Sequence, residues 1–387
     1  LFADAYPIMR LTSSEAIAQL AERIKETVDR PDAYDVVAER DGTLAGAMRL
    51  YDFRMNVRGR DAPAHKRGGI ARALIAWYLK RYRTSCATFA LLYPFKLDFY
   101  RALGFGYGTP MCRYSFSPST LRDDGARGTL RLLGEDDLDA MHASYERVRS
   151  VTNGLIVKHR AATERALADA ALRFVAVEDG GAVRGFMQTS VSVAADTLRN
   201  RDELVVRDMV YEDGAYQAAL FGYLRSQRDQ FARVVIESQD DAFYLASTDP
   251  RDGSDETTAP PVAHRVAKTG FGVMYRILDL DRALAHLSGA DQFTLELIVD
   301  DPLLPELSGS GTFRFGSHDS PRRDESAGQP DATLEIGIAD LSSVVIGSLR
   351  LRDVVRHRLA TLEPREMLQR VDAAFYTDQA PQCHTRF

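Results

Sequence analysis

A run of basic and glycine residues precedes an amphipathic helical pattern early in the chain. The run reads His65-Lys66-Arg67-Gly68-Gly69-Ile70-Ala71, and apolar residues continue at helical spacing to position 78. Glycines at a helix start let backbone N–H groups approach a phosphate closely, and the helix N-terminus itself favours anions. The pattern predicts a phosphate-binding turn formed by Lys66, Arg67, Gly68, Gly69, Ile70 and Ala71. The alternative is a solvated helix entry, because a Gly-Gly pair alone is weak evidence.

A second stretch whose residues could take part in catalysis follows a buried-looking strand at 86–93. It reads Phe99-Tyr100-Arg101-Ala102-Leu103-Gly104-Phe105. With Lys66-x-x-Gly69-x-Ala71, it resembles the GNAT acetyltransferases, in which an Arg/Gln-x-x-Gly-x-Gly/Ala loop binds the pyrophosphate of acetyl-coenzyme A. In that family a Tyr-x-x-x-Gly-Phe/Tyr motif supplies the tyrosine that protonates the departing thiolate. Lysine replaces the usual first loop residue here and keeps the positive charge.

The run from Tyr100 to Gly108, the basic loop and the domain order resemble, more narrowly, the Eis (enhanced intracellular survival) family. The resemblance covers nearly the whole chain and implies an acetyl-coenzyme A-dependent amine acetyltransferase. The implied fold class is α/β (α+β), with two GNAT-like mixed-sheet domains followed by a sterol-carrier-protein-like α+β domain. We place these at residues 1–120, 121–275 and 276–387, the second being degenerate. The resemblance also implies a homo-oligomer, such as a hexamer.

The same resemblance assigns an acid and a base. Tyr100 would protonate the thiolate of coenzyme A, and the alternative is a core tyrosine that packs on the sheet. The base would be the terminal carboxylate of Phe387, and the alternative is a frayed chain end. In GNAT proteins the oxyanion donor is a backbone N–H on the strand before the phosphate loop, and the sequence does not show which residue supplies it.

Histidines and cysteines elsewhere form no recognisable site. Three cysteines at wide spacing suggest neither a disulfide framework nor a zinc site, so we expect no metal. A thiol nucleophile at Cys383-His384 lacks an oriented third group. The remaining candidates, which have no metal-ligand spacing, are His142, His159 and His264.

The elements that position these residues are predicted to occur twice. A helix over 12–25 precedes a strand at 35–39, an Asp41-Gly42 turn and a strand at 43–55. The hairpin returns at 174–193 around Asp179-Gly180, which indicates a degenerate internal duplication. The second copy continues with a strand, a helix and a strand at 203–211, 215–225 and 231–237. The first copy has only the helix, at 70–82, and the strand at 86–93.

The first copy lacks an obvious strand between its hairpin and its helix. Residues 58–64 are polar and contain a proline, and the second copy is longer here by about seven residues, roughly one strand. We therefore predict that residues are missing near Ala64 and His65, and others before Leu1, because GNAT folds begin with a strand. The second copy carries Glu212-Asp213-Gly214 where a phosphate would bind, so we expect no cofactor there.

A third region follows a linker over 248–262, whose composition favours a loop. Strands are predicted at 271–278, 293–299, 312–316 and 332–338, as an antiparallel sheet with a solvated loop at 322–331. Helices are predicted at 341–349, 351–359 and 366–375. The last eleven residues show no periodicity.

Composition limits the classes of function. The 387 residues exceed one ordinary domain, and a net charge of −6 argues against a nucleic-acid binder. The apolar runs are too short to cross a bilayer, so we expect no membrane segment, and cysteine usage suggests the cytoplasm.

The leading prediction is an N-acetyltransferase for primary amines. Its substrates would be polycationic small molecules, aminoglycoside-like or polyamine-like, or lysine side chains. Arg386 beside the terminal residue disfavours aminoglycosides, because a cation there repels them. The alternatives are a lipid-binding carrier with vestigial GNAT domains, and a scaffold that holds coenzyme A without turnover.

Overall fold

The computed structural model describes a chain that forms two compact units. The described residues are 33–40, 43–68, 72–193, 202–254, 263–287, 291–316, 319–326 and 328–384. Leu1–Thr109 and Gly272–Pro381 make one unit, and Pro110–Phe271 with Gln382–Phe387 makes the other. The helix predicted over 12–25, the Asp41-Gly42 turn, Gly69 to Ala71 and Phe387 lie outside the described residues. The domain boundaries after 120 and 275 stay predictions.

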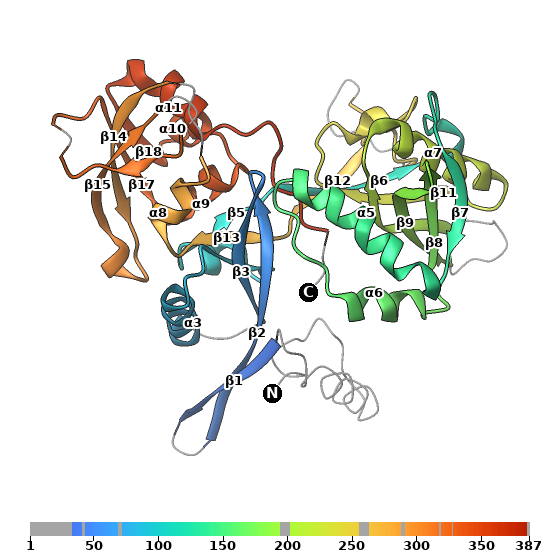
Figure 1. The fold of residues 1–387 in the computed structure, drawn as a ribbon, viewed down its shortest axis with the longest axis horizontal. Helices are drawn as coiled ribbons and strands as arrows, with labels where there is room; N and C mark the ends of the chain where they lie inside the picture. Colours follow the sequence, from blue (N-terminus) through green and yellow to red (C-terminus); the bar gives the residue numbers. More distant parts are fainter. Residues whose placement is uncertain are drawn as a thin grey trace. The chain divides into compact units, whose positions relative to one another are not determined.

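The first unit contains a mixed sheet assembled from two distant parts of the chain (Figure 1). β1 and β2 pair antiparallel, which confirms the predicted hairpin strands, and the strand predicted at 86–93 is the shorter β4. In spatial order the strands are β1 (Ala33–Arg40), β2 (Thr43–Val57), β3 (Arg60–Gly68), β4 (Phe89–Leu92), β13 (Met274–Ile277) and β5 (Gly106–Tyr107).

Strand β3 contradicts the prediction that residues are missing near Ala64 and His65. Both residues lie inside β3, which pairs antiparallel with β2 on one side and parallel with β4 on the other. We predicted that residues are missing near Ala64 and His65 and that no strand lies over 58–64, and both predictions were therefore wrong. Polar residues and Pro63 disfavour a strand locally, but a central position supplies backbone partners on both sides, and this pairing overrides the local preference.

Helix α3 (Arg72–Thr84) makes the crossover that a parallel β3–β4 pair requires. It corresponds to the helix predicted over 70–82. Leu74, Ile75, Tyr78 and Leu79 are buried at the spacing of an amphipathic helix, and they pack into one core with Ala90 and Leu92 of β4. A short helix, α4 (Leu97–Arg101), follows β4.

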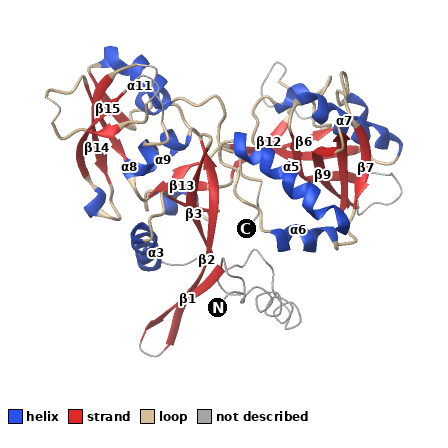
Figure 2. Cartoon of the chain, in the orientation of Figure 1, coloured by secondary structure: helices blue, strands red, loops and turns tan. Residues whose placement is uncertain are grey.

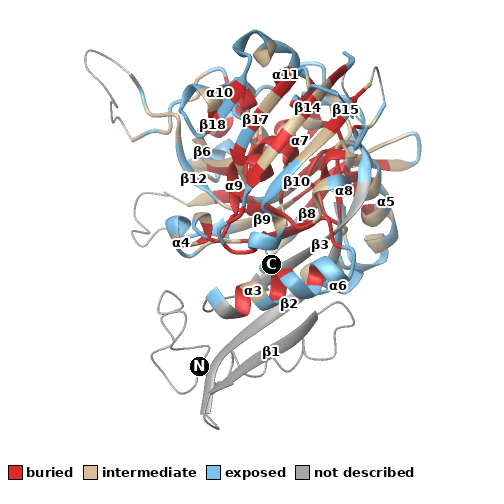
Figure 3. Cartoon of the chain, turned by 90° about the vertical axis from the view of Figure 1, so that its left-hand side faces the viewer, coloured by how far each residue is buried: buried red, intermediate tan, exposed pale blue. Residues whose placement is uncertain are grey.

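The C-terminal part of the first unit is a second sheet with short helices around it (Figure 2). Its strands, in spatial order, are β16 (Arg322–Arg323), β15 (Gly309–Phe315), β14 (Phe293–Asp300), β17 (Ala332–Gly337) and β18 (Ala360–Glu363). Its helices are α8 (Leu280–Leu284), α9 (Ile338–Ile346), α10 (Leu351–Arg356) and α11 (Leu368–Phe375). All nine residues of α9 are buried (Figure 3).

Two predictions for this region were wrong in part. β14 and β17 pair parallel, so the sheet is mixed rather than antiparallel; the long segment between them provides the necessary crossover. The single strand predicted over 271–278 is two strands in different sheets. β12 (Ala267–Phe271) ends one sheet, and β13 begins at Met274 in another.

The second unit is a seven-stranded sheet with helices on both of its faces (Figure 2). Alternate residues of β8 (Arg173–Asp179) face opposite cores: Val175 and Val177 pack with α7 (Gly214–Ser226), whereas Phe174 and Ala176 pack with α5 (Leu138–Val151). The strands in order are β12, β6 (Pro110–Phe116), β11 (Arg233–Ser238), β10 (Glu203–Tyr211), β9 (Ala182–Ser192), β8 (Arg173–Asp179) and β7 (Thr129–Leu133). The helices are α5 (Leu138–Val151), α6 (Arg160–Leu167) and α7 (Gly214–Ser226). Among the described residues of both units, single 3-10 turns are Pro118–Thr120, Glu135–Asp137, Gln227–Asp229, Phe243–Ala246, Pro305–Leu307 and Arg365–Met367.

The backbone supports the predicted duplication. Each hairpin carries a β-bulge beside a paired glycine: the register shifts after Ala38, which lies opposite Gly46, and after Val177, which lies opposite Gly185. In both units the strand after the hairpin, β3 or β10, pairs parallel with the strand that follows the helix, β4 or β11. The turn of the second hairpin lies one residue later than predicted, because Gly180 and Gly181, both with positive φ, form it.

Candidate active site

The predicted phosphate loop leaves the carboxyl end of a parallel strand pair. Lys66, Arg67 and Gly68 are the last residues of β3, and Lys66 and Arg67 lie opposite Leu91 and Leu92 at the end of β4. In open α/β sheets, ligands bind beyond the carboxyl ends of neighbouring parallel strands. Gly69, Ile70 and Ala71 lie between β3 and α3, outside the described residues.

Tyr100 follows the carboxyl end of β4, the other strand of that pair. It lies on α4, is 2% exposed, and contacts Phe99 and Phe105 edge-on with ring centroids 5.1 and 6.1 Å away. Tyr100 also shares a core with Leu74 and Ile75, in the first turn of α3. The helix that begins after the phosphate loop and the predicted acid therefore pack into one core.

The glycine of the tyrosine motif has a packing reason. Gly104 has a φ of +83°, and a Cβ there would lie 1.5 Å from the Nη1 atom of Arg276. A side chain at position 104 is excluded both by backbone conformation and by this arginine. Sequence reasoning missed Arg276, Asp301 and Asp340, which surround the motif. The available signal was an arginine inside the apolar strand β13, because buried charges are paired.

The residues before Phe387 are bound within the second unit. Gln382 donates its N–H to the carbonyl of Asn153 at 2.8 Å, and Cys383 donates its N–H to Oε1 of Gln239. His384 Nδ1 lies 3.4 Å from Oδ1 of Asp208. Hydrogen bonds therefore hold the chain as far as Cys383, and the buried Cys383 thiol is not an accessible nucleophile.

Asp208 is a fixed negative charge in this tail-binding region. Burial alone would raise the pKa of its carboxyl, but the Lys158 ammonium and His384 beside it lower that pKa well below its usual value. Asp208 is therefore ionised across the physiological range, and it holds an ion pair with Lys158.

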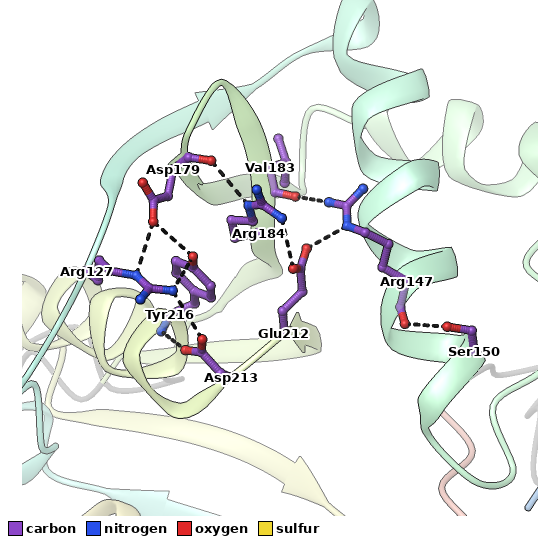
Figure 4. Close-up of polar contacts among 9 residues, drawn as sticks. All are labelled: Arg127, Arg147, Ser150, Asp179, Val183, Arg184, Glu212, Asp213 and Tyr216. Atoms are coloured by element: carbon purple, nitrogen blue, oxygen red, sulfur yellow. Dashed lines mark hydrogen bonds and ion pairs between the residues drawn. The ribbon is translucent and has the colours of Figure 1, made fainter. Parts of the chain in front are cut away.

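The corresponding helix start in the second unit is occupied by carboxylates (Figure 4). Asp213 accepts hydrogen bonds from the N–H groups of Ala215 and Tyr216 at the start of α7, at 2.8 and 3.2 Å. Glu212 pairs with Arg147 and Arg184 at 2.8 and 3.2 Å. The backbone donors that a phosphate would need are thus bound by a side chain of the same sign of charge.

The described ranges hold no cluster of three or more His, Cys, Asp or Glu side chains suited to a metal ion. Nor does any helix within them combine the length and apolar character needed to cross a membrane.

Three family models match successive parts of the chain. Two describe an acetyltransferase (GNAT) domain, over residues 9–108 and 154–277. The third describes a sterol carrier protein domain, over residues 280–384. A search of curated protein sequences finds no match.

Solved structures share this architecture over nearly the whole chain. A GCN5-related N-acetyltransferase from Anabaena variabilis matches with a TM-score of 0.77 and 17% identity, over 97% of this chain and 98% of its own. One from Kribbella flavida gives 0.74 and 21%, over 99% and 97%. Eis1 from Mycobacterium abscessus gives 0.74 and 22%, over 91% and 90%. At sequence identities this low, the structural similarity establishes that these proteins share the fold of this chain.

The family models identify the type of each domain, which the structural similarity alone does not. They confirm the fold class and the order of domains inferred from the sequence. GNAT domains use acetyl-coenzyme A as the acyl donor. The chain is an acyltransferase that contains two GNAT acetyltransferase domains and a sterol carrier protein domain.

Proposed function

We propose that the first GNAT domain transfers the acetyl group of acetyl-coenzyme A to a primary amine. The acceptor is a polycationic small molecule, aminoglycoside-like or polyamine-like, or a lysine side chain. One observation supports this most: the phosphate loop and Tyr100 follow the carboxyl ends of the paired strands β3 and β4. A thioester whose pyrophosphate lies at the loop would extend along that edge.

Each role in the reaction has a proposed residue. Lys66 to Ala71 bind the pyrophosphate, and the backbone of β3 supplies the oxyanion donor. The amine nitrogen attacks the thioester carbonyl, and the C–N bond forms as the C–S bond breaks. The carboxylate of Phe387 accepts the proton lost by the nitrogen, and Tyr100 gives its phenolic proton to the thiolate.

The Tyr100→Phe variant tests the assignment of the acid. We expect kcat for the best amine of a panel to fall roughly 100-fold or more, because general acid catalysis is worth about that much. The assay measures release of the coenzyme A thiol. Tyr78→Phe is the matched control, because Tyr78 is a fully buried tyrosine of the same core. An unchanged rate in Tyr100→Phe would show that Tyr100 is a packing residue.

Adding one glycine after Phe387 tests the base. The extension moves the carboxylate by about 3.5 Å, and displacements of about 1 Å can already cost 100-fold in rate. We expect turnover to be lost while the melting temperature is retained. Phe387→Tyr is the control, because it keeps both the carboxylate and an aromatic ring. Full activity in the extended chain would remove the terminal carboxylate from the mechanism.

The lipid-carrier alternative is less well supported. In a carrier the sterol carrier protein domain would enclose an apolar ligand, yet its helix α9 is buried on all sides by protein. Ser342 of α9 even accepts a hydrogen bond from the backbone N–H of Ile277, in the sheet of the first GNAT domain. A carrier with vestigial GNAT domains would give no heat on titration with acetyl-coenzyme A, and a scaffold would bind it without releasing thiol.

Three finer features stay predictions, two of them from the Eis resemblance and the location from cysteine usage. They are membership of that family, a cytoplasmic location, and a homo-oligomer such as a hexamer. Light scattering on the purified protein measures the mass that decides the last of these.

A further inference from the structure

The segment that carries Tyr100 is bound by a buried ion pair. Arg276 of β13 and Asp301, just after β14, have side chains that are 0% exposed, and Nη2 of Arg276 lies 2.5 Å from Oδ2 of Asp301. The other guanidinium nitrogen, Nη1, donates to the carbonyl of Leu103 at 2.6 Å. Leu103 in turn donates its N–H to the carbonyl of Tyr100 at 3.0 Å. Two successive hydrogen bonds thus connect the ion pair to the backbone of the proposed acid.

Asp301 is itself held in one orientation. Its Oδ1 atom accepts the N–H groups of Leu303 and Leu304, at 3.1 and 2.9 Å. Burial lowers the pKa of Arg276, and the Asp301 carboxylate opposes that effect. The Asp301 carboxylate is therefore held on one oxygen by two backbone N–H groups, and its other oxygen directs the Arg276 guanidinium, whose Nη1 donates to Leu103.

A second ion pair binds the same segment from α9. Nη2 of Arg101 donates to both carboxylate oxygens of Asp340, at 3.0 and 3.1 Å, and the guanidinium lies 4.9 Å from the ring centroid of Tyr107. The Asp340 side chain is only 10% exposed. Ser343, one turn further along α9, donates to the carbonyl of Tyr107 at 2.9 Å. The residue directly after Tyr100 is thereby attached to the sterol carrier protein domain.

Such pairs are poorly explained by stability alone. Desolvating two charges costs about as much as their attraction returns, and apolar residues of similar volume often stabilise a fold equally well. What ion pairs and hydrogen bonds add is direction, because their geometry is narrow. Here both pairs converge on the few residues around Tyr100.

We propose that Asp340 and Asp301 are positioning residues for acetyl transfer. Through Arg101 and Arg276 they hold the segment from Tyr100 to Tyr107, so that the phenol stays aimed at the departing thiolate. The sterol carrier protein domain thus completes the acid side of the active site. The inference rests on the proposed role of Tyr100.

A double-mutant cycle tests this inference. Asp340→Asn should lower kcat about 10-fold to 100-fold, as expected for a misplaced catalytic group, with little change in the Kd of acetyl-coenzyme A. In a Tyr100→Phe background it should cause no further loss, because the acid that it positions is already absent. Asp340→Glu should restore part of the rate. The control is Asp372→Asn, which breaks the Arg350–Asp372 pair elsewhere in the same domain and should leave kcat unchanged.

A second variant covers the case in which Asp340→Asn does not fold. The pair Arg276→Met with Asp301→Asn removes both buried charges, and the Asn oxygen can still accept the N–H groups of Leu303 and Leu304. It should fold, yet lose rate only when Tyr100 is present. An unchanged kcat, or losses that multiply with Tyr100→Phe, would overturn the inference. If Tyr100→Phe alone has no effect, the proposed acid itself is wrong, which is a different result.

Discussion

At the scale of single residues, Arg58 shows how one side chain can connect two distant parts of a unit. It lies in the turn between β2 and β3 with a φ of +51°. Its guanidinium donates to the carbonyls of Val345 and Tyr376, at 3.0 and 2.8 Å, and to that of Phe375. These carbonyls lie at the ends of α9 and α11, where helices leave acceptors without partners and carry partial negative charge.

We expect Arg58→Ala to destabilise the protein by about 2–4 kcal/mol, because several half-buried carbonyls lose a charged donor at once. Denaturant unfolding gives the measurement. Arg58→Gly separates the loss of the donor from backbone strain, since glycine accepts the positive φ without strain but supplies no donor. Arg83→Ala, on an exposed position of α3, is the control. A change below about 0.5 kcal/mol in both Arg58 variants would mean that the carbonyls are satisfied otherwise.

Residues of the site were predictable only where chemistry is local in sequence. The basic loop and the Tyr100 motif were identified from spacing within a few positions. Asp301 and Asp340 are separated from Tyr100 by about half the chain, and a lone aspartate carries no local pattern. Arg276 did carry one, a charge within an apolar strand, but its partner could be found only through the fold.

At the scale of elements, α3 and α7 occupy equivalent places in the two copies but differ at their first turns. α7 begins with Asp213 bound to its own backbone N–H groups, whereas the loop before α3 is basic. A helix N-terminus favours one anion, and in α7 a carboxylate already provides it.

We therefore expect one coenzyme A per chain. Calorimetric titration of the full chain should give a stoichiometry of one, and Lys66→Ala with Arg67→Ala should remove most of the signal. Arg147→Ala in the second unit should leave the titration unchanged, because its charge pairs with Glu212. A stoichiometry of two would show that α7 binds a phosphate despite Asp213.

The elements themselves were largely predictable, and the exceptions have physical causes. β8, β9, β10 and α7 were found because runs of apolar and β-branched residues, and apolar residues at helical spacing, are signals carried by adjacent residues. β3 was missed because its strand character comes from two neighbours, not from its own polar residues. The parallel β14–β17 pair was missed because direction is set by the crossover between the strands, which composition does not reveal.

At the scale of the whole molecule, the duplication and the domain order could be inferred from sequence, but the partition of the chain could not. The first unit takes residues from both sides of Pro110–Phe271, because β13, which follows that segment, lies between β4 and β5 in the first sheet. The pairing of β13 with β4 joins residues about 180 positions apart, and no local pattern encodes such a contact.

This division of the chain into two interleaved units determines which shortened chains keep their sheets complete. A fragment that stops near Thr109 would expose the edge of β4, since the strand that covers it is encoded far downstream. The ends of the intervening segment, by contrast, are neighbours: Gly108 donates its N–H to the carbonyl of Val273 at 3.0 Å, and Tyr107 lies opposite Met274. Excising 110–271 and ligating Thr109 to Gly272 would leave a hairpin with a four-residue loop, a length that antiparallel strands commonly use. A shortened chain of that kind would keep the first sheet whole, while residues 382–384 would lose the groups of the second unit that they contact.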